Sequence, residues 1–178
     1  MTKVEEKGEL VAQYLSFILR EENFAIEISK VREVLDVTVL TKIPRMPEYL
    51  SGVINLRGNV VPVMDLGLKL GMTGIEQTHN TCIMIVELEV EGETVDMGLL
   101  TDSVQMVIDL RNDDIEAVPK MGTGIDTEFI KGMGRQDEKF LIILDIDKVL
   151  AKEGRAVLQD NSDEIIGAEQ AEAVTATA

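Results

Sequence analysis

The fold is decided by Tyr49–Leu70, YLSGVINLRGNVVPVMDLGLKL, because a second version, FIKGMGRQDEKFLIILDIDKVL, occurs at Phe129–Leu150. Aligned without a gap, the two stretches carry an apolar run at the same place. They also share a glycine, an aspartate and a leucine, which are Gly52/Gly132, Asp65/Asp145 and Leu70/Leu150. The match predicts two copies of one β-rich unit.

The similarity continues upstream, where Ala25–Asp36 aligns with Gly98–Asp109 in the same order. Residues that both copies keep are expected to serve the fold, and residues present in one copy are candidates for function. The clearest difference is at the tip of the predicted hairpin. The first copy has Asn55–Asn59 there, NLRGN, and the second has Arg135–Lys139, RQDEK.

Size and charge narrow the class of protein. A chain of 178 residues forms one domain or two small subdomains with a real core. A net charge of −16 argues against nucleic acid or an anionic membrane as a partner, since both need a cationic surface. The longest apolar runs, such as Phe140–Leu144, are far shorter than the roughly 20 residues that span a bilayer. With no signal-peptide core near Met1, a cytoplasmic protein without membrane insertion is predicted.

Alternating apolar residues predict many short strands, which is typical of small barrels. In the first half they predict a hairpin, a short helix begun by Ser29 with Val31, Val34 and Leu35 on one face, a further strand and a brief helix. The hairpin is predicted at Gln13–Leu19 and Phe24–Ile28, the further strand at Val37–Ile43, and the brief helix at Glu48–Leu50.

The repeated unit then predicts a hairpin of Gly52–Leu56 and Val60–Met64, with Pro62 at a sheet edge or bulge because it lacks an amide donor. A helical turn at Asp65–Met72 and a polar junction at Thr73–Asn80 follow. The second half predicts strands at Thr81–Val90, Thr94–Leu100, Val104–Leu110, Phe129–Met133 and Lys139–Leu144, and a last helix at Lys148–Ala151.

Little in the sequence points to catalysis. The single histidine, His79, lies in a polar loop, and the single cysteine, Cys82, begins an apolar strand, so neither predicts a catalytic dyad or a metal site. No catalytic residue, metal or cofactor is therefore assigned. Abundant carboxylates leave a small acid-catalysed hydrolase as a remote alternative.

Arg57-Gly58 has several readings. Glycine supplies the positive φ of a tight turn, and arginine then only covers it. Alternatively, the Arg57 guanidinium binds a partner's carboxylate, or it clamps an acidic group inside this chain. The residues alone do not choose between a contact and a clamp.

Four stretches resemble the CheW-type chemotaxis coupling proteins. They are Tyr14–Leu19, Phe24–Val34 with its ISKVREV core, Gly52–Leu66 with its NLRG element, and Gly98–Val107. The resemblance covers about residues 12–152. It implies a mainly β fold of two intertwined, five-stranded, SH3-like barrels with short helices. Subdomain 1 is expected at about 13–72, subdomain 2 at about 81–146, and a closing helix at 146–152.

Residues outside this domain are expected to be a flexible N-terminus, 1–11, and a disordered acidic tail, 153–178. From about residue 158 onwards the chain has acidic but no basic residues, a composition typical of disorder. An acidic interaction tail is the alternative.

The resemblance also implies a non-enzymatic adaptor. It would join the cytoplasmic tips of chemoreceptors to the regulatory domain of the CheA histidine kinase, at membrane-associated receptor arrays. The alternative within binding proteins is a CheW-like module of a CheV-type protein or of a kinase. No receiver-like repeat is present and Met1 begins just before the fold, so a free-standing adaptor is favoured.

By matching positions, the resemblance implies two sets of contact residues. Receptor binding is assigned to Val31, Glu33, Val104 and Val107, where a receptor helix would lie in a groove between subdomains. Kinase binding is assigned to Leu40, Lys42, Gly52, Arg57 and Gly58. Glu33→Lys is accordingly expected to weaken receptor binding and to spare kinase binding.

Overall fold

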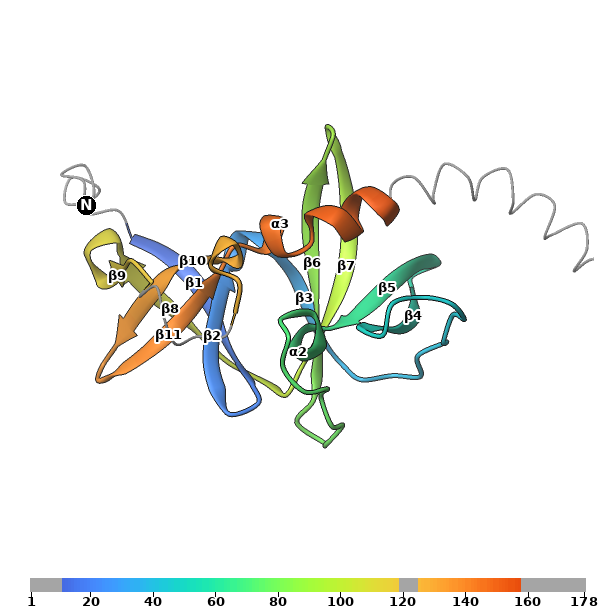
Figure 1. The fold of residues 1–178 in the computed structure, drawn as a ribbon, viewed down its shortest axis with the longest axis horizontal. Coiled ribbons are helices and arrows are strands. Elements are labelled where there is room, and N and C mark those ends of the chain that lie inside the picture. The colour runs from blue at the N-terminus through green and yellow to red at the C-terminus, as the bar shows by residue number, and fades with distance from the viewer. Residues whose placement is uncertain (1–10, 119–124, 158–178) are drawn as a thin grey trace, which may run out of the picture.

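The computed structural model describes residues 11–118 and 125–157, and within them strands in two sheets dominate (Figure 1). The first half contains β1 (Val11–Leu19), β2 (Glu22–Glu27), η1 (Ile28–Lys30), β3 (Val31–Asp36), β4 (Leu50–Leu56), β5 (Asn59–Asp65) and α2 (Leu66–Lys69). The second half contains β6 (Cys82–Val90), β7 (Glu93–Thr101), β8 (Ser103–Arg111), η2 (Asn112–Asp114), β9 (Ile115–Glu116), η3 (Thr127–Phe129), β10 (Ile130–Gln136), β11 (Lys139–Leu144) and α3 (Ile146–Val149). The predicted flexible N-terminus, apart from Val11, and the tail from residue 158 lie outside the described residues.

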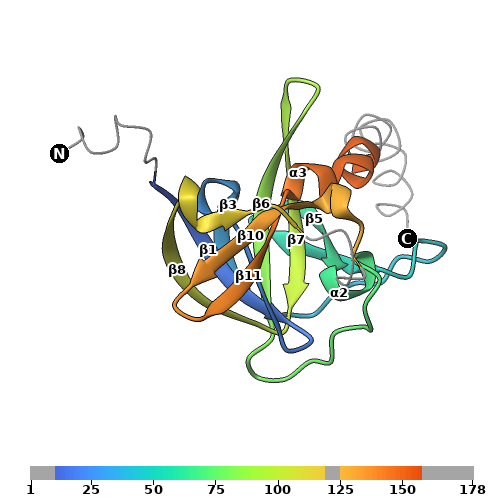
Figure 2. The ribbon, with the colours of Figure 1, turned by 60° about the vertical axis from the view of Figure 1, so that its left-hand side comes forward.

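Each sheet takes strands from both halves of the chain. One sheet has the order β3-β6-β7-β5-β4, and the other has the order β8-β1-β2-β11-β10-β9. The predicted mainly β, intertwined architecture is confirmed, with each sheet forming one of two lobes side by side (Figures 1 and 2). Two details differ. The short β9 makes the second sheet six-stranded, and contiguous subdomains at 13–72 and 81–146 are wrong, because β1–β2 and β6–β7 each pair with the opposite half.

The exchange of strands follows the sequence duplication. Val63 of β5 pairs with Gly98 of β7, and Ile143 of β11 pairs with Ala25 of β2, both in parallel. Val63 aligns with Ile143 and Ala25 with Gly98, so each parallel pair joins the same two positions from opposite copies. The chain crosses between sheets at η1, leading into β3, and near Asp102, leading into β8.

The two hairpin units have the same internal geometry. The register shifts by one residue between Leu50 and Gly52 in β4, and between Ile130 and Gly132 in β10. The amide that ends each hairpin donates to the first aromatic residue of the unit, Asp65 to the Tyr49 carbonyl at 2.7 Å and Asp145 to the Phe129 carbonyl at 2.9 Å. The predicted duplication is therefore a duplication of structure.

Three predicted elements of the first half are wrong. The helix after Ser29 is a three-residue 3₁₀ turn followed by strand β3. The backbone of β3 pairs with β6. Side chains along β3 alternate between the two faces of the sheet, so Glu33 and Leu35 share a face with Val31, while Val34 is exposed. The strand predicted at Val37–Ile43 is irregular, with one bridge from Thr41 to Val53, and the helix predicted at 48–50 is a turn into β4.

Pro62 was predicted at a sheet edge or bulge, and it lies in an interior strand of the sheet rather than in an edge strand. Its strand, β5, lies between β7 and β4, and Pro62 is opposite Val53 of β4. Pairing of β5 with β7 begins only at Val63, so Pro62 has a strand neighbour on one side alone. The missing amide therefore costs no bond in the β5–β7 ladder.

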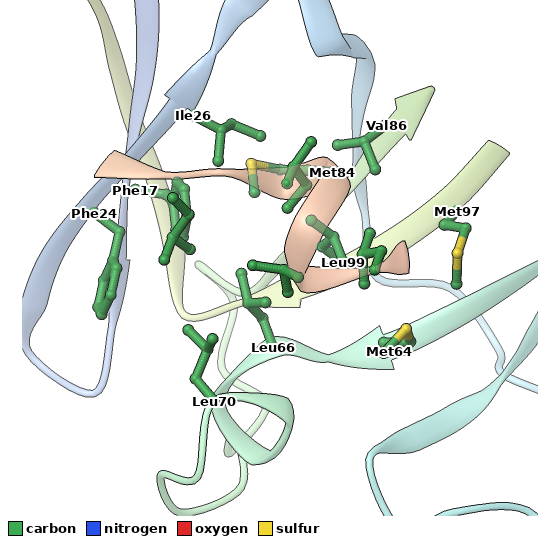
Figure 3. Close-up of a cluster of buried hydrophobic side chains, with 14 of the residues drawn as sticks. Phe17, Phe24, Ile26, Met64, Leu66, Leu70, Met84, Val86, Met97 and Leu99 are labelled. Carbon is green, nitrogen blue, oxygen red and sulfur yellow. The ribbon is translucent and has the colours of Figure 1, made fainter. Parts of the chain in front are cut away.

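The main core lies where the two sheets meet, and it includes Leu66 of α2 and Ile146 and Val149 of α3 (Figure 3). Phe17 and Phe24 stack with ring centroids 5.9 Å apart, and side chains from both sheets complete the cluster. Met64, Met84 and Met97 are buried there, whereas Met106, in β8, is 56% exposed. Fully burying each large apolar side chain contributes about 2 kcal/mol, so this shared core holds the lobes together.

The closing helix runs further than predicted. After α3, residues 151–157 are also helical, five residues beyond the expected end at 152. Gly154 is buried against Val90 and Leu88, and Val157 packs against the main core. The predicted tail from 153 is therefore wrong for 153–157, which belong to the folded domain.

Candidate partner-binding surfaces

The four residues predicted to bind a receptor lie on two edge strands, one from each sheet. Val31 and Glu33 are in β3, and Val104 and Val107 are in β8. Val31 and Val104 are equivalent in the two copies, follow the two crossovers, and pack partly buried against the same core. Val107 is 48% exposed on β8. The strand exchange thus places Val31 and Val104 against the core that the two sheets share.

Glu33 forms a bidentate ion pair with Arg57. The guanidinium donates from Nη1 to Oε2 at 2.6 Å and from Nη2 to Oε1 at 2.9 Å. Hydrogen bonding from Arg57 holds the pKa of Glu33 below its ordinary value, and the same bond raises the pKa of Arg57. Glu33 was assigned to the receptor set and Arg57 to the kinase set, so the two sets meet at this pair.

The geometry around this ion pair also bears on whether Arg57 is a partner contact or an internal clamp. Arg57 and Gly58 form the two-residue turn between β4 and β5, with φ of 52° and 90°. The Gly58 amide donates to the Asn55 side chain at 2.8 Å. The Arg57 side chain remains 69% exposed, so it is not a buried clamp. Turn chemistry and an intramolecular ion pair are both present, and part of the guanidinium faces solvent.

Leu40 and Lys42, from the kinase set, lie in the irregular segment between β3 and β4. Both line a cavity of about 750 Å³ with Val37, Ser51 and Asp65, which we name the Leu40 cavity. Two hydrogen bonds between Thr41 and Val53, at 2.9 and 3.0 Å, fasten the segment to β4. Leu40 is partly buried and Lys42 is exposed. This surface adjoins β4, whose other end carries Arg57.

Gly52 is buried beneath this segment. Its φ is +150°, and a Cβ there would be 2.7 Å from the Thr41 carbonyl oxygen and 3.2 Å from the Leu40 Cβ. A side chain would push Thr41 and Leu40 outward. Any part of Gly52 in partner binding is therefore indirect, through the position of Leu40.

Sequence reasoning missed an apolar groove on the other side of the same segment. Ile43 and Met46, 41% and 43% exposed, line it with Val60, 62% exposed. Pro62, Tyr49 and residues 152, 153, 156 and 157 of the C-terminal helix also line this cavity of about 240 Å³, which we name the Val60 groove. Strand alternation could have found Val60, since Val61 is buried and its neighbour must face outward. The contribution of helix 151–157 had no sequence signal.

A buried polar network holds that helix beside the groove. Glu153 Oε2 accepts from the Tyr49 hydroxyl and from Lys69 Nζ, both at 2.7 Å. Lys69 Nζ also lies 4.8 Å from the centroid of the Tyr49 ring. Burial, helped by the bond to Glu153, raises the pKa of Tyr49 to about 12. Burial acts to raise the pKa of Glu153, but hydrogen bonds from Lys69 and Tyr49 outweigh it and leave that pKa lowered.

Neither His79 nor Cys82 is placed in a reactive cluster. His79 is exposed in its loop, and Cys82 is partly exposed rather than fully buried, with Sγ 3.2 Å from the Asn80 carbonyl oxygen. Within residues 11–118 and 125–157, no three His, Cys, Asp or Glu side chains are grouped to hold a metal ion. Nor does this part of the chain contain a helix long and apolar enough to cross a membrane.

Comparison with known proteins identifies the fold and the family. The CheW-like domain family matches residues 13–154. Chemotaxis protein CheW of Klebsiella aerogenes is 34% identical, over 86% of this chain and 90% of that protein. Its counterpart in Helicobacter pylori is 30% identical, over 84% and 87%.

A solved structure agrees with this match. Scaffolding protein TtCheW from Thermoanaerobacter tengcongensis superposes with a TM-score of 0.68 and 36% identity, over 76% of this chain and 89% of that one. CheV3 of Helicobacter pylori is 29% identical, over 71% of this chain and 40% of that protein. The family match spans most of the chain and agrees with both the curated relatives and the solved fold. The chain therefore belongs to the CheW-like domain family.

Proposed function

We propose that the chain is a non-enzymatic adaptor that joins chemoreceptors to the regulatory domain of the CheA histidine kinase. The observation that carries this proposal is the CheW-like match over residues 13–154, with relatives named for chemotaxis and a solved neighbour described as a scaffolding protein. The expected place of action is the cytoplasmic side of receptor arrays. No cofactor is needed for a scaffold whose work is to hold two partners together.

The receptor arm is proposed to use β3 and β8. Val31 and Val104 lie after equivalent crossovers and pack on the same core, and Val107 supplies exposed apolar surface. The cytoplasmic tip of a receptor is helical in this proposal, and an amphipathic helix binds by laying its apolar face along such a surface.

The kinase arm is proposed to use the Leu40 cavity and the β4–β5 turn. Leu40 and Lys42 offer an apolar and a cationic side chain, and Arg57 keeps exposed donor groups besides its bond to Glu33. Arginine binds carboxylates in a bidentate manner, so an acidic group on the kinase surface is its expected partner.

A two-partner binding assay tests the proposal. The purified chain is titrated with the kinase regulatory domain and, separately, with a receptor cytoplasmic fragment. Val107→Asp is expected to weaken receptor binding by about tenfold, because a charge enters an apolar contact, and to leave kinase binding unchanged. Val11→Asp, at another exposed valine of sheet β8-β1-β2, is the matched control. If the unaltered chain failed to bind one of the two partners, the result would contradict the adaptor proposal.

Glu33→Lys is a poorer separator of the two arms than its sequence position suggested. Lysine at 33 would face Arg57 and would both remove the ion pair and add a repulsion. We therefore expect Glu33→Lys to disturb both arms. The double reversal Glu33→Arg with Arg57→Glu restores the internal pair, so it separates loss of the pair from loss of contacts.

A second candidate is a CheW-like module of a longer signalling protein, a reading favoured by the partial match to CheV3. Such a module would present the same two arms. An immunoblot of cells with an antibody to this domain distinguishes the candidates. The adaptor gives a band near 19.7 kDa, and a module gives a larger one.

A further inference from the structure

The Val60 groove is an open apolar surface in a strongly acidic chain. Val60, Ile43 and Met46 are each more than 40% exposed, and they adjoin one another around a single cavity. Tyr49 and Glu153, which form part of its lining, are fixed by the hydrogen bonds among Tyr49, Lys69 and Glu153. A preformed apolar groove of this kind is suited to one or two aliphatic side chains.

The groove has an unusual charge around it. Lys152 lines it, Arg45 lies between the lining residues Ile43 and Met46, and Arg155 precedes the lining residue Ala156. Lys42 adjoins Ile43 in sequence. Within the described residues, none of these four cations forms an ion pair, although the chain carries 33 acidic side chains. An occupant with both acidic and apolar side chains would place the acidic ones beside these four cations and the apolar ones in the groove.

Residues 158–178 have the composition of such an occupant. They contain five acidic residues and no basic one, with the aliphatic pair Ile165-Ile166 directly after Asp163-Glu164. The segment begins beside the groove, because Val157 is part of the lining. Eight residue steps separate Val157 from Ile165 and reach at most about 29 Å, which is enough to return to a neighbouring groove.

We propose that residues 158–178 cover the Val60 groove of their own chain, with Ile165 and Ile166 as anchors and the acidic residues beside the cationic rim. Tethering is the reason to choose this occupant over a second copy. A short link gives an effective concentration in the millimolar range, so even a weak contact is populated within one chain. Because Ile43 follows Lys42, the covered groove adjoins the proposed kinase arm. If that arm is correct, the segment competes with the kinase.

The test uses the full chain without kinase or receptor, so its result does not depend on the proposed function. Nuclear Overhauser effects, which report methyl groups in direct contact, are recorded between Ile165 or Ile166 and the groove residues Ile43, Met46 and Val60. We expect these contacts in the unaltered chain. Ile165→Ser with Ile166→Ser should shift the methyl resonances of the three groove residues, whereas Val174→Ser, a matched change further along the segment, should leave them in place.

Two further arms make the result decisive. Val60→Asp, at an exposed position that leaves the core intact, should remove the contacts of Ile165 and Ile166 with Ile43 and Met46. Mixing chains that carry different isotope labels, and selecting effects between the two labels, reveals contacts between copies. Absence of the contacts in the unaltered chain, unchanged groove resonances in the isoleucine variant, or contacts found mainly between copies would each overturn the proposal.

Discussion

The hairpin units at 49–70 and 129–150 have the same backbone but present different surfaces. Gly52 and Gly132 lie at equivalent register shifts, and Asp65 and Asp145 cap equivalent short helices, α2 and α3. The turn residue of the first unit, Arg57, binds Glu33, whereas its equivalent, Asp137, has no ion pair within the described residues. The comparison teaches that shared residues maintain the unit and unshared residues give each lobe its own surface.

The first unit also makes a buried polar contact that the second unit lacks. Lys69 at the end of α2 joins Glu153 and Tyr49, while its equivalent, Val149, is buried in apolar surroundings with Phe129 in place of Tyr49. The polar pair ties the first unit to the C-terminal helix. The second unit needs no such tie, because α3 leads directly into that helix.

The largest expected effect tests the shared glycines. Gly52→Ala should lower the free energy of unfolding by about 4 kcal/mol, because it adds an unfavourable φ to a clash with the Thr41 backbone. Gly132→Ala meets chiefly the Ile115 side chain, on the short β9, and should cost about 1 kcal/mol. Urea unfolding of both variants gives the two values. Equal costs would mean that the backbone constraint at Gly52 is not special.

The next effect tests the polar tie. Lys69→Met leaves Glu153 as a buried carboxylate without its cation and should cost about 3 kcal/mol. Lys148→Met, near the matching end of α3, removes a cation without an ion pair in the described structure and should change stability by less than about 0.5 kcal/mol. Thermal unfolding of the pair measures the difference. A large loss at both positions would point to general helix effects.

The same network has a pH dependence of known sign. Because the pKa of Glu153 is lowered in the folded state, its contribution is complete above the ordinary value of 4.5 and is lost as the pH falls through the folded value. Unfolding free energies measured from neutral to acid pH should fall less steeply for Glu153→Gln than for the unaltered chain. Parallel curves would exclude Glu153 from the acid loss.

A smaller effect compares the two helix caps. Asp65 is buried and accepts from the amides of Leu68 at 3.0 Å and Ile75 at 2.8 Å. Among the described residues, the Asp145 side chain accepts only from the Lys148 amide, at 3.2 Å. Asp65→Ala should therefore cost about 2 kcal/mol and Asp145→Ala about 1 kcal/mol, measured by urea unfolding. A reversed order would refute the role given to the second bond.

The repeat made much of this fold predictable. Identities at Gly52/Gly132 and Asp65/Asp145 mark positions where backbone geometry permits few residues, so they survive in both copies. The pairing partners were beyond local reasoning, because alternation shows that Val63 and Ile143 are in strands but not which copy supplies the neighbour. The residues after Ser29 were predicted as a helix since Val31, Val34 and Leu35 fit a helical spacing. Pairing with β6 overrode that local pattern.

The sequence predicted only part of the spatial arrangement of the contact residues. Equivalence of Val31 and Val104 indicated a shared surface, and both residues do pack on the shared core. The ion pair between Glu33 and Arg57 joins residues that are 24 positions apart, and no local sequence pattern predicts it. The Val60 groove likewise depends on helix 151–157 returning to β5, a long-range contact.

The most direct test of the central claim compares Arg57→Ala with Arg135→Ala. Each variant removes an exposed arginine that forms an ion pair near a hairpin tip, Arg57 with Glu33 and Arg135 with Glu116. Both variants should unfold at the urea concentration of the unaltered chain. Titration with the kinase regulatory domain should show about tenfold weaker binding for Arg57→Ala alone. Equal weakening by both variants, or a weakening that follows a loss of stability, would contradict the claim that the unshared Arg57 of the first unit contributes to kinase binding.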